Sequence, residues 1–252
     1  MIEEHFYILV YIWIGFGILL FPILLKIPAP YGRHTRKGWG SLISNRLGWI
    51  IMEIPALIVF IVFFLSGTGQ ISGITWIFMI LWGSHYLNRS ILYPLRIKTK
   101  NKKMPVLIVL FAVIFNVMNG FINGYYFGTI RPVYNTSWLI DPRFMIGLVL
   151  FLTGVYLNIS SDEKLLSLRN HSSNIYTIPS GGMFRYISCP NFFGEIIEWT
   201  GFAIMSWSLA ALAFAIWTFV NLIPRSLDHH RWYRHKFEDY PRHRKAIIPF
   251  II

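Results

Sequence analysis

The sequence is poor in charged residues and contains a single cysteine. Charged side chains make up 13% of its 252 residues, while 55% of the residues are hydrophobic; an ordinary soluble domain carries about a quarter charged residues. So little polar surface cannot cover a globule in water, which excludes a soluble protein and predicts an integral membrane protein. The lone Cys189 excludes an internal disulfide, and no set of metal ligands uses it.

We expect no nucleic-acid partner, although the formal net charge is +12. The basic residues cluster in short loops between apolar runs, where a membrane protein carries them. The apolar runs cover residues 6–25, 47–65, 74–88, 104–124, 144–159 and 191–223. The last run is too long for one upright helix, which needs about 20 residues to cross a bilayer. We therefore predict a break in it near residues 206–208.

The distribution of basic residues sets the expected orientation. The loops after the first and third runs are rich in Lys and Arg, so both are expected in the cytoplasm, together with the basic tail of residues 224–245. This arrangement requires an odd number of spans, which the break supplies. The predicted fold is an all-α integral membrane protein with seven transmembrane helices, the N-terminus outside and the C-terminus cytoplasmic. Residues 1–252 are expected to form a single domain.

Polar side chains inside the apolar runs mark candidate functional positions, because charge in lipid is costly and is usually retained for function. Glu53 lies near the middle of the second run, where a carboxyl group is expected to be protonated, partnered or facing a cavity. It either ties helix to helix or, as a neutral acid, donates a hydrogen bond to a substrate oxygen. Tyr86, Arg89 and Tyr93 share a helix face, either as a site or as an interface belt.

A second polar set gathers at the start of the last run. In N-F-F-G-E-I-I-E-W, Asn191, Glu195 and either Glu198 or Trp199 share one helix face. The structural alternative is that the two carboxylates lie at the water interface and end the span. Two carboxylates, an amide and an indole on one face exceed what an end requires, so this stretch is a candidate site.

The remaining polar patterns are less specific. P-S-G-G at residues 179–182 lets backbone approach a ligand closely, but it is not G-x-G-x-x-G and follows no strand, so a Rossmann fold is excluded. An ordinary turn is the alternative. The tail carries one histidine cluster where membrane di-iron enzymes need several, so we expect no metal. Its basic residues suit lipid headgroups or, alternatively, a dinucleotide.

Taken together, these segments resemble the steroid 5α-reductase (3-oxo-5α-steroid 4-dehydrogenase) family, as a bacterial-type homologue. They cover the chain from about residue 30 to the C-terminus in the order and spacing of the family. The matching pieces are P-Y-G-R-H-T at 30–35, Glu53, H-Y-L-N-R at 85–89, N-I-S-S-D at 158–162 with Arg169, I-P-S-G-G at 178–182, N-F-F-G-E-I-I-E-W at 191–199, H-H-R-W-Y at 229–233 and F-E-D-Y-P at 237–241. The sequence departs from the family at Ala210, where a proline is expected to help separate the last two helices.

The resemblance implies hydride transfer from NADPH to the 4,5 double bond of a 3-oxo-4-ene steroid such as testosterone or progesterone. N-terminal helices would shape the substrate pocket, and residues of about 144–252 would bind the cofactor. By position, Glu53 and Tyr86 match the pair that contacts the 3-keto oxygen. The positions assigned to the cofactor are Tyr31, Arg89, Tyr93, Asn158, Asp162, Arg169, Tyr176, Asn191, Glu195, Trp199, Arg225, His229 and Tyr233, where Trp199 is included because it shares the helix face of Asn191.

The expected setting is a bacterial inner membrane or the endoplasmic reticulum membrane, with the cofactor site facing the cytoplasm and no obligate protein partner. Other functions stay open at this point. The same scaffold could carry a polyprenoid or enoyl-lipid reductase. A membrane methyltransferase that uses S-adenosylmethionine and a sterol-binding or transport protein are further alternatives.

Overall fold

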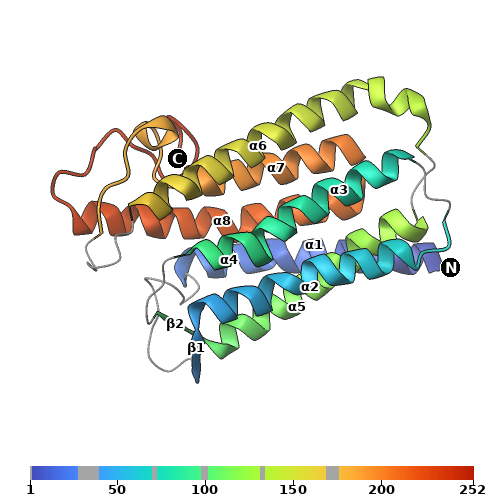
Figure 1. The fold of residues 1–252 in the computed structure, drawn as a ribbon, viewed down its shortest axis with the longest axis horizontal. Coiled ribbons are helices and arrows are strands. Elements are labelled where there is room, and N and C mark those ends of the chain that lie inside the picture. The colour runs from blue at the N-terminus through green and yellow to red at the C-terminus, as the bar shows by residue number, and fades with distance from the viewer. Residues whose placement is uncertain (1, 28–39, 70–72, 98–101, 131–133, 169–175) are drawn as a thin grey trace. The chain divides into compact units, whose positions relative to one another are not determined.

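The computed structural model of the chain is built almost entirely from helices (Figure 1). It describes all residues except 1, 28–39, 70–72, 98–101, 131–133 and 169–175. The α-helices are α1 (Ile2–Lys26), α2 (Asn45–Leu65), α3 (Gly73–Leu87), α4 (Tyr93–Arg96), α5 (Val106–Tyr125), α6 (Pro142–Ser167), α7 (Pro190–Ser206) and α8 (Leu209–Lys236). The other elements are the strands β1 (Leu42–Ser44) and β2 (Lys103–Pro105), the π-helical segments η2 (Asn88–Leu92) and η3 (Tyr126–Ile130), and the 3-10 helices η4 (Thr136–Ile140) and η5 (Gly182–Arg185).

Within the described ranges, five helices are long and apolar enough to cross a membrane, namely α1, α2, α5 with η3, α6 and α8. Large apolar side chains stand on their outer surfaces: Leu19 is 73% exposed, Phe111 56% and Val149 64%. Exposed apolar surface of this extent is typical of helices that face lipid. A multi-pass membrane protein is therefore supported. α3 and α7 have 15 and 17 residues, which is short for a membrane span, so the count of seven spans stays a prediction. The orientation of the termini also stays a prediction.

The break between the last two helices lies at Trp207. α7 ends at Ser206, Trp207 has a left-handed φ of 46°, and the Ser208 hydroxyl accepts a hydrogen bond of 3.1 Å from the N–H of Ala211. A left-handed residue ends one helix, and a serine N-cap begins the next. The predicted break near residues 206–208 is confirmed, and the break forms with alanine at position 210.

Two helices run further than the apolar runs that contain them. α6 continues through the mostly polar residues 160–167, where the prediction ended at Ile159, and α8 continues to Lys236, where the prediction began a tail at Pro224. Hydropathy marks the part of a helix that suits lipid, while the backbone hydrogen bonds continue beyond it. Pro224 cannot donate to the carbonyl of Val220, but both residues are buried, and this packing supports the helix.

The all-α prediction misses a small β-ribbon. β1 pairs antiparallel with β2, with Leu42 opposite Pro105 and Ser44 opposite Lys103. α2 follows β1 directly and α5 follows β2 directly, so the ribbon sets the starts of both helices next to each other. Strands of three residues are too short to leave a periodic pattern in the sequence.

The contacts divide the chain into two compact units, residues 1–10 with 29–144 and residues 11–28 with 145–252. In the first unit, glycines bring the backbone of α5 and η3 against α2. A Cβ atom at Gly124 would lie 2.6 Å from the carbonyl oxygen of Phe60, and one at Gly128 would lie 2.4 Å from that of Phe63. Only glycine permits this approach, which places the polar face of α5 next to α2.

In the second unit, α6 and α7 also meet through glycines. A Cβ atom at Gly154 of α6 would lie 2.3 Å from the backbone nitrogen of Glu198, and one at Gly194 of α7 would lie 2.5 Å from that of Asn158. Figure 1 shows the two helices side by side. Backbones packed this closely fix the polar ends of α6 and α7 against each other.

The C-terminal residues fold back onto the loop that precedes α7. Lys245 pairs with Ile187 in a parallel bridge, and Nη1 of Arg244 donates a 3.0 Å hydrogen bond to the carbonyl oxygen of Pro179. Ile247 is fully buried in a cluster that includes Ile196 of α7. The segment from Pro179 to Ile187, which begins with the P-S-G-G turn and leads into α7, is thereby tied down at both ends.

Candidate active site

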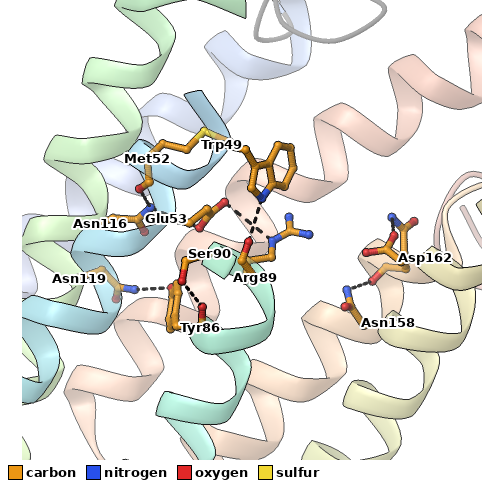
Figure 2. A network of polar contacts seen from close by, with 11 residues as sticks. Trp49, Met52, Glu53, Tyr86, Arg89, Ser90, Asn116, Asn119, Asn158 and Asp162 are labelled. Atoms are coloured by element: carbon orange, nitrogen blue, oxygen red, sulfur yellow. Dashed lines mark hydrogen bonds and ion pairs between the residues drawn. The ribbon is translucent and has the colours of Figure 1, made fainter. Parts of the chain in front are cut away.

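A carboxylate on α2 and a guanidinium on η2 form the centre of the first polar cluster (Figure 2). Oε1 of Glu53 lies 3.8 Å from Nε of Arg89, and the two side chains are 15% and 13% exposed. Asn116 of α5 donates from Nδ2 to Oε2 of Glu53 at 3.5 Å and to the carbonyl oxygen of Met52. Glu53 is therefore partnered, which is one of the states expected for a carboxyl group in an apolar run.

Arg89 also contacts two aromatic rings. Its guanidinium carbon lies 4.8 Å from the ring centroid of Trp49 and 5.7 Å from that of Tyr93, both within cation–π range. Nε1 of Trp49 donates a 3.0 Å hydrogen bond to the carbonyl oxygen of Arg89. The π-helical turn adds a residue between Tyr86 and Tyr93, so the predicted common face is only partly formed: Arg89 meets Tyr93, while Tyr86 meets α5.

Tyr86 of α3 is 3% exposed and is held by several neighbours. Its hydroxyl oxygen accepts a 3.3 Å hydrogen bond from Nδ2 of Asn119, and its carbonyl oxygen accepts one of 2.6 Å from the hydroxyl of Ser90. Its ring centroid lies 5.1 Å from that of Trp82. Asn119 is in turn contacted by Asn123, whose Nδ2 donates to Oδ1 of Asn119 at 3.1 Å. The phenol of Tyr86 is thus fixed in place by α3, η2 and α5.

Sequence reasoning did not single out the amides of α5. Asn116, Asn119 and Asn123 are 5%, 2% and 0% exposed, and their spacing of i, i+3 and i+7 places them on one helix face. Three amides on one face of an otherwise apolar span form a polar stripe that suits contacts between membrane helices. That pattern is the signal that could have found them.

A second polar cluster joins α6 to α7. Nδ2 of Asn158 donates a 3.0 Å hydrogen bond to the carbonyl oxygen of Asn191, and Nδ2 of Asn191 donates one of 3.0 Å to Oδ1 of Asp162. Asn158 and Asp162, drawn in Figure 2, are 4% and 6% exposed. The structure therefore brings together three residues that were assigned to the cofactor, and the close approach at Gly154 makes their contact possible.

Glu195 and Trp199 lie one turn apart on α7. Glu195 is half-buried, while Trp199 is 1% exposed. The ring centroid of Trp199 lies 4.3 Å from that of Phe214 and 6.2 Å from that of Phe151. These contacts place the Trp199 side chain among apolar core residues. Glu198 is also 1% exposed, with its backbone nitrogen on the side that faces α6.

Arg225 and His229 lie one turn apart on α8 and both approach the start of α7. The guanidinium carbon of Arg225 lies 5.7 Å from the ring centroid of Phe192, and the His229 ring lies 5.7 Å from the same ring. Phe192 is the residue next to Asn191. A guanidinium and an imidazole are therefore gathered near the end of α7 that carries the amide cluster.

Tyr233 and Tyr176 are the remaining described residues of the predicted cofactor set. Tyr233 lies further along α8, and Tyr176 lies in the segment between α6 and α7. The ring of Tyr233 is stacked 5.4 Å from that of Tyr240 and is 4% exposed. The ring of Tyr176 contacts Trp232 edge-on at 5.0 Å. These contacts place Tyr176 and Tyr233 beside the polar end of α8, one helix turn or more beyond His229.

Two predicted cofactor contacts, Tyr31 and Arg169, lie outside the described residues. Among the residues that are described, no three His, Cys, Asp or Glu side chains gather in a way that could hold a metal ion. The groups that do gather are amides, carboxylates, a guanidinium and an imidazole. Such a set can pair with the carboxamide and phosphate groups of an organic cofactor.

Comparison with known proteins gives one consistent result. The family described as 3-oxo-5-alpha-steroid 4-dehydrogenase matches residues 102–252. Over 91% of this chain and 90% of the relative, the chain is 40% identical to the steroid 5-alpha-reductase DET2 of Arabidopsis thaliana. It is 38% identical to 3-oxo-5-alpha-steroid 4-dehydrogenase 1 of Bos taurus over 97% of this chain and 96% of the relative. The human protein of the same name is 37% identical over 96% and 94%.

Proposed function

Since the chain belongs to the 3-oxo-5-alpha-steroid 4-dehydrogenase family and is an enzyme of that kind, we propose that it reduces the 4,5 double bond of 3-oxo-4-ene steroids to give 5α-reduced 3-oxo-steroids. One observation supports this reaction above all. Glu53 and Tyr86, an acid and a phenol, are each contacted by an amide of α5 within apolar helices. Testosterone and progesterone carry the enone that such a pair would recognise.

The proposed chemistry follows from the polarity of an enone. The double bond accepts hydride at carbon 5 only as negative charge moves to the 3-keto oxygen, and carbon 4 then takes a proton. Hydrogen-bond donors in a dry site stabilise that charge. We assign the Tyr86 hydroxyl and the protonated Glu53 carboxyl to this role. To donate a hydrogen bond, the Glu53 carboxyl, which lies beside Arg89, would carry a proton.

We propose NADPH as the cofactor, which when bound would supply the hydride. The groups of the second unit fit a nicotinamide dinucleotide: the amides of Asn158 and Asn191 with Asp162 can pair with a carboxamide, and Arg225 and His229 can pair with phosphate. Burial of these groups in apolar helices is otherwise costly, which favours a ligand role. Further proposed contacts are Tyr31, Arg89, Tyr93, Arg169, Tyr176, Glu195, Trp199 and Tyr233.

The same proposal includes the topology. Two further spans would join the five long helices. One is formed by α3, η2 and α4 together and the other by α7, which gives seven spans with the N-terminus outside. The end of α8 carries the exposed Arg231, Arg234 and Lys236, which suits the cytoplasmic face of a bacterial inner membrane or of the endoplasmic reticulum. In one domain, N-terminal helices would shape the substrate pocket and residues of about 144–252 would bind the cofactor. An apolar steroid could arrive through the bilayer.

The test uses protein purified in detergent and returned to lipid nanodiscs. NADPH oxidation is followed with testosterone and progesterone, and in parallel with a polyprenoid enone and a long-chain enoyl lipid. We expect a 5α-steroid product by mass spectrometry and chromatography, formed only with the cofactor. If only the lipid substrates are reduced, the proposed substrate is a lipid rather than a steroid. Methyl transfer from S-adenosylmethionine, or steroid binding without NADPH oxidation, would reject the proposed reaction.

A further inference from the structure

The amide of Asn119 and the hydroxyl of Tyr86 form a hydrogen bond inside the apolar part of the first unit. The two atoms are 3.3 Å apart, and the residues are 2% and 3% exposed. Asn119 comes from α5 and Tyr86 from α3, so the bond links two helices (Figure 2). Such a contact could serve only to hold the helices together, or it could also set the direction of the Tyr86 O–H group.

The neighbours of Asn119 decide which end of its amide faces Tyr86. Asn123 donates from Nδ2 to Oδ1 of Asn119 at 3.1 Å and to the Asn119 carbonyl oxygen at 3.1 Å. Oδ1 is therefore the accepting end, and the NH₂ group is the end that reaches Tyr86. A phenolic oxygen that accepts from an amide turns its own hydrogen to the other side. Tyr86 then acts as a donor toward the acceptor on that side.

Other contacts fix the backbone and the ring of Tyr86. The contact with Asn119 therefore affects only the direction of the hydroxyl group. Ser90 holds the backbone carbonyl of Tyr86 at 2.6 Å, and the rings of Trp82 and His85 lie 5.1 and 5.0 Å from its ring. Replacing Asn119 should therefore change the polarity at the hydroxyl while the ring stays in place. A polarity effect of this kind can be separated from a packing effect by experiment.

We propose that Asn119 is a positioning residue: its amide donates to the Tyr86 oxygen, so that the Tyr86 hydroxyl is directed to donate to the 3-keto oxygen of a bound steroid. This inference rests on the proposed function, because it deepens the role assigned there to Tyr86. Asn119 acts through Tyr86 and does not itself contact the substrate. Asn123 supports it by holding the Asn119 amide in the donating orientation.

The test is a double-mutant cycle between Asn119 and Tyr86, read by progesterone binding. Asn119→Asp keeps the size and the acceptor for Asn123 but lets the carboxylate take the Tyr86 hydrogen. Asn119→Ala serves if the aspartate does not fold. One hydrogen bond corresponds to roughly tenfold in affinity, so we expect about tenfold weaker binding, measured by quenching of tryptophan fluorescence. In the Tyr86→Phe background, the same change should weaken binding by less than about twofold, because the hydroxyl is gone.

The kinetic version of the cycle adds a second readout. Asn119→Asp should lower kcat about tenfold or more with an unchanged KM for NADPH, again only while the Tyr86 hydroxyl is present. Ser90→Ala is the matched control, because Ser90 contacts the backbone of the same residue. It should lower the thermal midpoint but change progesterone binding by less than about threefold.

The outcomes are distinguishable. Equal losses from Asn119→Asp in the presence and absence of the Tyr86 hydroxyl would overturn the positioning role and leave steroid reduction standing. Progesterone binding without reduction would reject the proposed reaction, while the binding cycle would still decide the role of Asn119. A wild-type protein that binds no 3-oxo steroid would overturn both.

Discussion

Arg89 and Glu53 form an ion pair across two helical elements, with Nε and Oε1 3.8 Å apart and both side chains largely buried. The desolvation of two such charges is offset only while they stay together, so removing one partner leaves an uncompensated charge. Asn116 and Trp49 attach to the same pair, one through the carboxylate and one through the backbone of Arg89. The pair therefore links the stability of the first unit to the residue proposed to act on the ketone.

Arg89→Met should destabilise the protein by about 3 kcal/mol, because Glu53 loses its cation in an apolar setting. The double variant Arg89→Met/Glu53→Gln should recover most of the loss, since both charges are then absent. Thermal unfolding followed by intrinsic fluorescence measures both. If the double variant is as unstable as the single one, the ion pair is not the source of the effect.

Glu53→Gln should reduce steroid turnover by about 10²–10³-fold. The amide keeps the size of the side chain but is a far weaker acid, so it cannot share a proton with the developing enolate. NADPH binding, followed by nicotinamide fluorescence, should stay unchanged, because Glu53 is assigned to the ketone. Glu238→Gln, at an exposed position, is the control. Near-normal turnover in Glu53→Gln would remove Glu53 from the mechanism.

Gly154→Ala should separate α6 from α7. The added Cβ would lie 2.3 Å from the backbone nitrogen of Glu198, and overpacking of this kind costs about 1–3 kcal/mol. The contact of Asn158 with Asn191 would be lost with it, so NADPH binding should weaken as well. Thermal unfolding and nicotinamide fluorescence report the two effects.

The control for that substitution is Gly83→Ala in α3. No atom lies within 4 Å of a Cβ placed there, and alanine favours a helix over glycine by up to about 1 kcal/mol. This variant should be neutral or slightly stabilised and should bind NADPH normally. A similar loss in both variants would indicate that glycine content rather than close packing matters.

Asp141 should give a pH-dependent contribution to stability. Hydrogen bonds from the side chain of Arg143, at 2.9 and 2.8 Å, lower the pKa of Asp141 from 3.8 to about 2. A folded-state pKa below the unfolded value stabilises the protein above that value, and the contribution is lost as pH falls through the folded pKa. The thermal midpoint of the wild type should exceed that of Asp141→Asn at neutral pH.

That difference in midpoint should close between pH 3.8 and about 2, where the carboxylate is protonated. The effect is small because the group is only partly buried and is screened by solvent. Asp239→Asn, at an exposed position, is the reference for the general effect of removing one carboxylate. A difference between wild type and Asp141→Asn that is constant with pH would rule out the Arg143 contact as its cause.

The sequence predicts those features whose signal is local. Apolar runs locate the long helices, and the excess length of the last run predicts the break that the structure places at Trp207. Glu53 and Asn191 stand out because they are polar within or beside apolar runs. These predictions need no knowledge of which helices touch.

The remaining features depend on contacts between helices. The pairing of Glu53 with Arg89 and of Tyr86 with Asn119 requires α2, α3 and α5 to pack in one register, which glycine contacts on α5 set. Trp199 is a residue for which the predicted surroundings and the observed neighbours differ. It lies on a helix face predicted to be polar, yet the rings of Phe151 and Phe214 surround it. Helix periodicity gives the face of a residue but not the neighbour that meets that face.

The π-helical segment η2 has a consequence for how this protein tolerates insertions and deletions. A π turn carries one residue more than the α turn it replaces, and each residue of an α-helix advances the chain by about 100° around the axis. Loss of one residue between Ser90 and Leu92 would let the helix relax to α geometry. Arg89 would then rotate around the helix axis relative to Tyr93, while the chain on either side stayed helical. A change of length alone, with no change of residue type, can therefore alter the contacts that Arg89 makes.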